Sequence, residues 1–240
     1  MSRMFTLGKE DRIKTINPFH GCVYECYNGR CWANLRANRF RTMGVKGYEE
    51  GFKPTFCPWV LDKEKRKRKR FERDEVVAVG LMGDISCIPI VERKIIVREL
   101  IERNPFTTFL LESKNPMVYK EMISYLPSNV ILSTTIETNR WYDYEGVSKA
   151  PSPLERYNVM KELNWDKKHI SAEPIMDFDL YEFFGWLHSI EPMVVSIGYD
   201  NYNAGLKEPT LKKTIELIKM LEHFVKVEKK TIRNANWEIL

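Results

Sequence analysis

Three cysteines within ten residues are the part of this chain best suited to chemistry. Cys22, Cys26 and Cys31 follow the spacing C-x3-C-x4-C. Thiolates are ligands for soft metal centres, and a closed zinc site or a fully cysteine-ligated iron–sulfur cluster takes four protein ligands. Three thiolates therefore leave one coordination position for a substrate or a second cofactor. The spacing predicts an open metal centre.

Two other interpretations of the cysteines stay open. They could be ordinary buried thiols, because free cysteine is common in protein cores. They could also bind zinc with His20 as a fourth ligand. The surrounding loop argues against burial, because it contains turn-forming and charged residues. These are Pro18, Gly21, Glu25, Asn28, Gly29 and Arg30.

Length and composition indicate one globular domain, which we expect to span residues 1–240. The chain has 240 residues, of which 43% are hydrophobic and 30% charged. It has no apolar run long enough to span a membrane, and its first residues lack a signal-peptide core. Five cysteines, an odd number, suit a reducing compartment, so we expect a cytoplasmic protein. The absence of glutamine and the abundance of Lys and Glu are typical of thermophiles.

A basic run covers residues 63–73, with six consecutive cations from Lys65 to Arg70. Such a run is either a solvated surface or a patch that contacts phosphate groups. It makes nucleic acid a possible partner.

Short apolar runs alternate with segments of helical periodicity, which is typical of a parallel α/β sheet. The expected strands lie at 12–16, 76–82, 107–111, 130–136, 170–172, 193–197 and 224–228. The expected helices lie at 32–43, 90–103, 116–126, 153–163, 180–190 and 209–223. We predict a partial (β/α) barrel of about six to seven parallel strands, TIM-like but short of the full eight. Residues 44–75 form an insertion, and a doubly wound open sheet is the alternative.

An acidic residue follows five successive predicted strands. These residues are Asp84, Glu112, Glu137, Glu173 and Asp200. In parallel α/β folds the carboxyl ends of the strands form the rim that carries the functional site. Some of the acids could instead stabilise helix starts, and Asp200 could be a turn residue. We expect them to share the rim with Lys114, Asn139 and Arg140.

A cysteine triad after the first strand of a partial barrel resembles the radical S-adenosylmethionine superfamily. More narrowly, the chain resembles an uncharacterised phage-type branch with a three-cysteine motif. The similarity covers about residues 12–235, and the matching motifs follow one another in order along the chain. The motifs are 17–22 (Asn-Pro-Phe-His-Gly-Cys), 31–33, 82–84, 112–116, 135–139 and 171–174.

The resemblance implies a cofactor set and a radical reaction. Cys22, Cys26 and Cys31 would ligate a [4Fe–4S] cluster, with S-adenosylmethionine on its fourth iron. Reductive cleavage of S-adenosylmethionine would give a 5′-deoxyadenosyl radical that abstracts hydrogen from an unknown substrate. Gly83 and Asp84 would hold the methionyl amino group. An electron donor, unknown from the sequence, would be needed.

The resemblance also implies roles for other rim residues. The candidates for ribose or carboxylate contacts are Ser133, Thr135 and Glu137. Tyr27 or Trp32 would pack near the adenine. Glu173, Lys114 and Asp200 would face the substrate. Cys57 and Cys87 are either hydrogen-atom donors or plain buried thiols.

The chain also departs from the superfamily pattern. Its second cysteine gap is two residues longer than in the common C-x3-C-x2-C motif, and Met82-Gly83-Asp84 stands where Gly-Gly-Glu is usual. The fifth-strand Gly-x-Ile-x-Gly motif is replaced by residues 171–173, Ser-Ala-Glu. Two other functions remain: a zinc-dependent or other metal hydrolase, and a nucleic-acid-binding protein with a structural metal.

Overall fold

The computed structural model describes residues 13–62, 71, 73–140, 142 and 144–238. Within these residues, seven strands form one parallel sheet whose spatial order follows the chain. They are β1 (Lys14–Ile16), β4 (Val76–Val79), β5 (Thr108–Glu112), β6 (Val130–Thr135), β7 (Lys168–Ala172), β8 (Val194–Ile197) and β9 (Lys226–Lys229). A doubly wound sheet would reverse its strand order at a switch point. This curled sheet does not, so the predicted partial barrel is confirmed.

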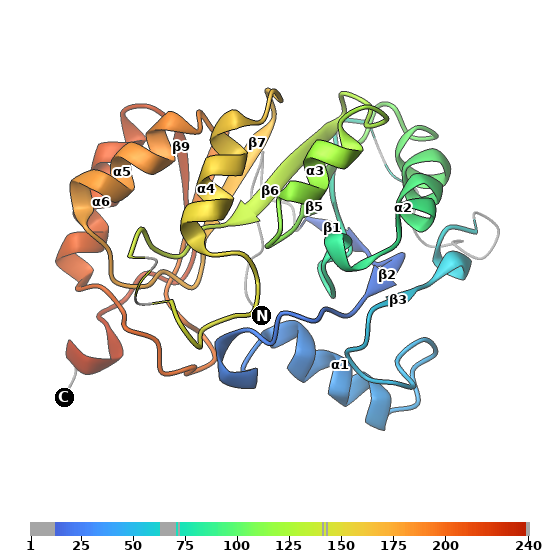
Figure 1. Ribbon diagram of the computed structural model, residues 1–240, viewed down its shortest axis with the longest axis horizontal. Coiled ribbons are helices and arrows are strands. Elements are labelled where there is room, and N and C mark those ends of the chain that lie inside the picture. Colours follow the sequence, from blue (N-terminus) through green and yellow to red (C-terminus); the bar gives the residue numbers. More distant parts are fainter. Residues whose placement is uncertain (1–12, 63–70, 72, 141, 143, 239–240) are drawn as a thin grey trace.

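In the described part of the chain six α-helices accompany the sheet (Figure 1). They are α1 (Trp32–Thr42), α2 (Ile90–Ile96), α3 (Met117–Met122), α4 (Pro153–Glu162), α5 (Leu180–Ser189) and α6 (Leu211–Glu222). The predicted helix at 90–103 is α2 followed directly by a π-helical turn, Val97–Ile101. Helix α1 follows the cysteine loop and lies along the lower edge in Figure 1.

The two faces of the sheet differ in chemistry. The main apolar core packs between the sheet and the outer helices, and includes Phe109, Leu132 and Val195. On the opposite face a small apolar cluster is formed by Ala78, Leu110 and Ile131. Towards the carboxyl ends of the strands that inner face becomes polar. Side chains alternate along each strand, so a strand can present apolar residues to the helices and polar residues to the inside.

The predicted insertion at 44–75 contributes a short second sheet. In it β2 (Phe19–His20) pairs in antiparallel fashion with β3 (Thr55–Phe56). Most of the basic run at 63–73 lies outside the described residues. Among the helices that are described, none is both long and apolar enough to cross a membrane.

Candidate active site at the carboxyl ends of the strands

Two glycines bring the cysteine loop against the end of β4. Gly21 and Gly83 form a parallel bridge, in which the Gly21 amide donates to the Met82 carbonyl at 2.9 Å. A Cβ atom on Gly83 would lie 2.7 Å from backbone atoms of Gly21. Gly21 itself has φ +85°, and a Cβ there would meet the Lys53 carbonyl oxygen at 2.2 Å. Only glycine permits this approach, which places the loop beside Asp84.

The cysteine loop has an unusual backbone. Glu25, Tyr27 and Asn28 have φ values of +46°, +60° and +51°, in the left-handed region that non-glycine residues rarely adopt. Backbone contacts with the loop after β6 hold this conformation. The Tyr27 amide donates to the Val147 carbonyl, and the Lys149 amide donates to the Tyr24 carbonyl, both at 2.7 Å.

The three loop thiols are free, as a metal centre requires, but they point to different partners. The thiol of Cys22 hydrogen bonds with Cys87, and this contact, together with burial, raises the pKa of Cys22. The sulfur of Cys26 lies 3.1 Å from the Ser148 hydroxyl, and burial raises the pKa of Cys26. Cys31 packs in the same apolar cluster as Cys26. Among the described residues, no three Cys, His, Asp or Glu side chains surround a common metal position.

His20, the alternative zinc ligand, contacts residues outside the cysteine loop. It stacks on Tyr48 with ring centroids 4.0 Å apart, and its Nε2 lies 2.5 Å from the Gly47 carbonyl. Burial lowers the pKa of His20. The donor set therefore fits thiolate ligation of a cluster. A cluster held by these thiols would require the Cys22 side chain to leave Cys87.

A buried charge cluster lies next to Cys26. It consists of Tyr27, Lys114, Glu137, Tyr144 and Arg156. Glu137 is fully buried, and its Oε1 accepts hydrogen bonds from the hydroxyls of Tyr27 at 2.8 Å and Tyr144 at 2.9 Å. Lys114 also donates to Oε1, and the Nη1 of Arg156 donates to Oε2 at 2.9 Å. The resemblance-based candidates Tyr27, Glu137 and Lys114 are thus in direct contact.

The charges of this cluster stabilise one another. Burial by itself would raise the pKa of Glu137, but the cations Arg156 and Lys114 lower it to about 2. Burial would lower the pKa of Lys114, but the Glu137 carboxylate raises it. This charge cluster therefore holds two cations, Lys114 and Arg156, and one anion, Glu137, at neutral pH. That excess of positive charge suits an anionic neighbour.

Asp84 lies at the centre of a second set of contacts. Its Oδ1 accepts from the Ser86 amide at 2.9 Å, the Ser86 hydroxyl at 2.7 Å and the Ser113 hydroxyl at 2.6 Å. Its Oδ2 accepts from the Lys114 amide at 2.8 Å. A carboxylate offers about four acceptor positions, two on each oxygen. Oδ2 is therefore the oxygen with room for a further donor.

The polar inner face of the sheet is a row of hydrogen-bonded side chains. The Ser133 hydroxyl lies 2.8 Å from Nδ1 of buried His169, whose Nε2 lies 2.9 Å from the Ser196 hydroxyl. Ser196 in turn donates to Glu228 at 3.1 Å. Burial, with the nearby Lys230 charge, lowers the pKa of His169 to about 3, so this histidine is neutral.

Two further strand-end residues join this inner face. Glu112 is adjacent to Ser133 in the β5–β6 register, and burial raises its pKa to about 7. Thr135 is buried and hydrogen bonds with Glu112. Burial also raises the pKa of Glu173, which lies near Lys230.

The remaining sequence candidates, Asp200 and Trp32, are held by contacts of other kinds. Both carboxylate oxygens of Asp200 accept from backbone amides of its own turn, those of Tyr202 and Ala204. This geometry matches the turn interpretation of Asp200. Trp32 packs in a separate apolar cluster with Tyr48 and Met82.

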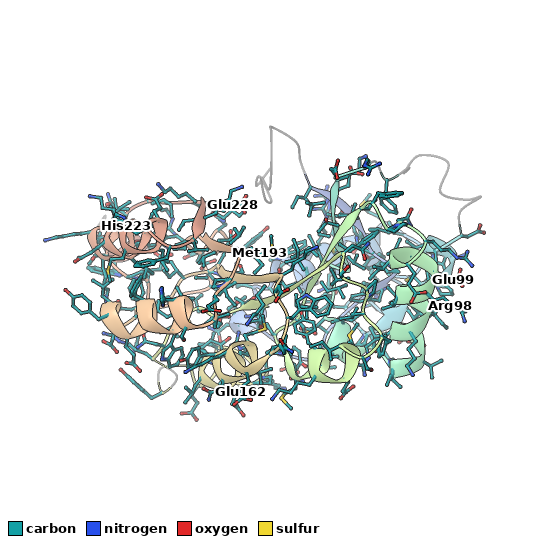
Figure 2. All side chains as sticks on the ribbon, turned by 90° about the horizontal axis from the view of Figure 1, so that it is seen from above. Arg98, Glu99, Glu162, Met193, His223 and Glu228 are labelled. Atoms are coloured by element: carbon teal, nitrogen blue, oxygen red, sulfur yellow. The ribbon has the colours of Figure 1, made fainter. Side chains whose placement is uncertain are left out.

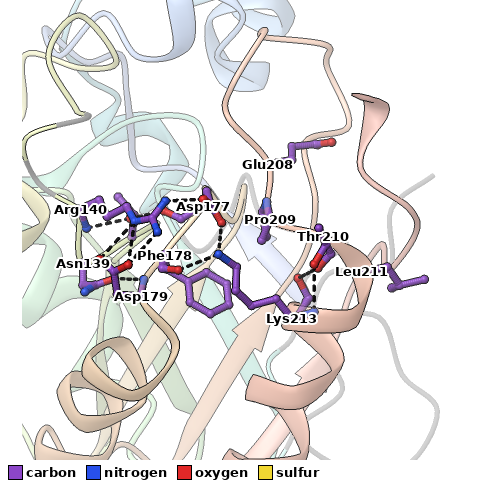
Figure 3. A network of polar contacts seen from close by, with 12 residues as sticks. Asn139, Arg140, Asp177, Phe178, Asp179, Glu208, Pro209, Thr210, Leu211 and Lys213 are labelled. Carbon is purple, nitrogen blue, oxygen red and sulfur yellow. Dashed lines mark hydrogen bonds and ion pairs between the residues drawn. The ribbon is translucent and has the colours of Figure 1, made fainter. Parts of the chain in front are cut away.

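Asn139 and Arg140 belong to a network that ties the strand-end loops together (Figure 3). Arg140 bonds Asp177 and Asp179, with Nη2 to Oδ1 of Asp179 at 2.7 Å. Lys213 of α6 also pairs with Asp177 and donates to the Phe178 carbonyl at 2.8 Å. This network fixes the loops after β6 and β7 against α6.

Sequence reasoning missed Arg156 and Tyr144, which complete the charge cluster. Arg156 is an arginine on an outer helix, a position that is normally exposed. A capping box starts that helix, with Ser152 and Glu155 bonded to each other's backbone amides. Arg156 follows Glu155 in the first turn of this helix, and its guanidinium group reaches Thr135 and Glu137 at the strand ends. The capping motif was readable in the sequence, but the burial of Arg156 was not.

Comparisons with known proteins agree on the architecture alone. No family model and no curated protein matches the chain. Among solved structures, a cysteine-to-serine mutant of spore photoproduct lyase superposes with a TM-score of 0.60 at 12% identity, covering 90% of this chain and 75% of the other. The chain shares its fold with spore photoproduct lyase.

Two further structures of spore photoproduct lyase are similar. One is complexed with dinucleoside spore photoproduct, at TM-score 0.55 and 12% identity. The other contains AdoMet and dinucleoside spore photoproduct, at TM-score 0.54 and 11% identity. Each covers 88% of this chain, which spans 61% of those lyase chains. The phage-type branch stays a prediction, because no comparison names it.

Proposed function

We propose that this protein is a radical S-adenosylmethionine enzyme. A [4Fe–4S] cluster held by Cys22, Cys26 and Cys31 would supply the electron that cleaves S-adenosylmethionine into methionine and a 5′-deoxyadenosyl radical. That radical would abstract a hydrogen atom from the substrate. The electron would come from an external donor.

The observation that carries the proposal is the position of the three free thiols. They lie on one loop that the Gly21–Gly83 bridge seats at the carboxyl end of a seven-stranded half barrel. A structure with this fold contains bound AdoMet, which is S-adenosylmethionine. Reactive centres of β/α barrels occupy this end of the sheet.

The surroundings support specific roles. Asp84 would bind the methionyl ammonium through Oδ2, beside Gly83, where a charge-assisted hydrogen bond contributes about 1.5–3 kcal/mol. The excess positive charge at Lys114 and Arg156 would favour the anionic thiolate-bound cluster near Cys26. Further cofactor contacts are proposed for Ser133, Thr135, Glu137, Tyr27 and Trp32. Substrate contacts are proposed for Glu173, Lys114 and Asp200.

Iron binding tests the metal ligands directly. We expect anaerobically reconstituted wild-type protein to bind iron and sulfide and to show the brown absorbance of a cluster. Replacing Cys22, Cys26 and Cys31 with Ala should abolish both. The matched control replaces Cys57 and Cys87, which are outside the loop, and should retain the cluster.

The outcomes separate the alternatives. Full iron and sulfide retention in the triple variant would contradict the assigned ligands. A colourless protein that binds stoichiometric zinc through the same cysteines would point to the zinc hydrolase or to the structural metal site.

A further inference from the structure

Helix α1 differs in charge from every other α-helix that the structure describes. Its sequence, WANLRANRFRT, contains three arginines and no carboxylate, whereas α2 to α6 each contain at least one Asp or Glu. Helices of soluble proteins often mix both signs, because oppositely charged neighbours stabilise the helix. The composition of α1 forgoes that stabilisation and points to an external partner.

The arginines of α1 are exposed and have no carboxylate partner within the described part of the chain. Arg36, Arg39 and Arg41 are all exposed, and no ion pair joins them to a carboxylate of the described residues. Two arginines in and just after the π-helical turn that follows α2 are paired instead. Arg98 and Arg103 both pair with Glu99, at 2.9 and 2.7 Å, and Figure 2 shows Arg98 beside Glu99 at the surface.

The charge extends into the segment around the helix. Residues 30–53 contain six cations, Arg30, Arg36, Arg39, Arg41, Lys46 and Lys53, and two carboxylates, Glu49 and Glu50. Glu50 is engaged by Lys53 at 2.6 Å. Buried Ala33 and Ala37 form the inward side of α1, so the charged side chains remain on the outside. The helix begins immediately after Cys31, its N-cap residue, so this basic surface adjoins the candidate site.

We propose that the exposed face of α1 binds the phosphate backbone of nucleic acid and presents a nucleotide to the candidate site. The guanidinium group matches the geometry of phosphate and binds it through two hydrogen bonds. Arg36 and Arg39 lie one turn apart on one flank of the exposed face, and Arg41 lies on the other flank, so the helix can contact phosphates on both of its sides. Asn38 lies exposed between them and can donate a further hydrogen bond.

Nucleic acid would be the substrate class of the proposed radical reaction. Only the reaction of the bound nucleotide rests on the proposed function. Backbone binding itself needs no cluster. It can therefore be measured on the cluster-free protein, independently of the iron assay. It also assigns binding to a described surface rather than to the basic run at 63–73, which the experiment leaves unchanged.

The test is fluorescence anisotropy of labelled duplex and single-stranded DNA over a series of salt concentrations. The test variant is R36S/R39S/R41S. The control, K161S/K212S/K219S, removes the same charge from exposed positions on α4 and α6. We expect the α1 variant to bind about tenfold or more weakly. We also expect the slope of log affinity against log salt to flatten by about 2–3, as the loss of three phosphate contacts requires.

Three results would overturn the inference. They are equal losses in the two triple variants, no salt-dependent binding of DNA by the wild type, and binding of anionic lipid vesicles in place of DNA. Circular dichroism of both variants checks that the fold is retained. A wild-type protein that takes up iron but does not bind DNA contradicts this inference alone. A wild-type protein that binds DNA but takes up no iron contradicts the proposed function alone.

Discussion

Arg156 and Glu137 form an ion pair in which neither side chain has any exposed surface, with Nη1 and Oε2 2.9 Å apart. Arg156 also donates to the Thr135 carbonyl at 2.6 Å and the Pro151 carbonyl at 2.8 Å. One arginine thus joins the end of β6, the start of α4 and the carboxylate beside the cysteine loop. Because Tyr27 donates to the same carboxylate, the pair also supports the backbone of that loop.

Arg156→Met should strongly destabilise the protein. Removing one member of a buried pair leaves an uncompensated charge and typically costs about 3–5 kcal/mol. Urea unfolding measures the free energy. Lys120→Met is the control, because its pair with Glu162 at 3.0 Å is exposed and should contribute at most about 1 kcal/mol. Similar losses of unfolding free energy in the two variants would show that the buried pair contributes no more stability than the exposed pair.

Glu137→Gln should make the free energy of unfolding less dependent on pH in the acid range. The pKa of Glu137 falls from 4.5 to about 2 on folding, so its stabilisation is complete above about pH 4.5 and is lost as the pH falls towards 2. The wild type should therefore lose about 3 kcal/mol relative to the variant across that window. Denaturant titrations at several pH values measure the difference. If the free energies of unfolding of wild type and variant change equally with pH, the assigned pKa of Glu137 is contradicted.

Glu112→Gln should have the opposite pH dependence. Burial raises the pKa of Glu112 from 4.5 to about 7, so the folded protein keeps a proton that the unfolded chain releases. Stability of the wild type should thus fall relative to the variant as the pH rises from about 4.5 to 7, by up to about 3 kcal/mol. A difference that does not change over this range would place the Glu112 carboxyl in a solvated environment.

Gly21→Ala should displace the cysteine loop and lower iron binding. The new Cβ would meet the Lys53 carbonyl at 2.2 Å, and φ is +85°. Gly29→Ala is a matched control in the same loop, because φ is +79° but no atom lies within 4 Å of its Cβ. It should cost only about 1 kcal/mol. We expect iron per chain after reconstitution to fall in the first variant and persist in the second. Equal iron contents would show that the Gly21 approach is not needed.

The fold could be predicted because its signals are local. Alternation of β-branched runs such as 130–135 with helical periodicity indicated the parallel units, and the acids after the strands marked the rim. Contacts between distant segments had no such signal. The pairing of Cys22 with Cys87, the burial of Arg156 and the polar row through His169 depend on how the strands curl and on which loops meet. Asp200 follows a strand as predicted, and its carboxylate also accepts two backbone amides of its own turn, so the residue type alone does not distinguish a site residue from a turn residue.

The most direct test of the central claim is the formation of 5′-deoxyadenosine. Reconstituted protein would be mixed anaerobically with S-adenosylmethionine and dithionite, and the nucleoside quantified by liquid chromatography and mass spectrometry. The wild type should form 5′-deoxyadenosine, and the variant with Cys22, Cys26 and Cys31 replaced by Ala should form none. A wild-type protein that carries a reducible iron–sulfur cluster and still yields no 5′-deoxyadenosine above the level of the triple variant would contradict the claim.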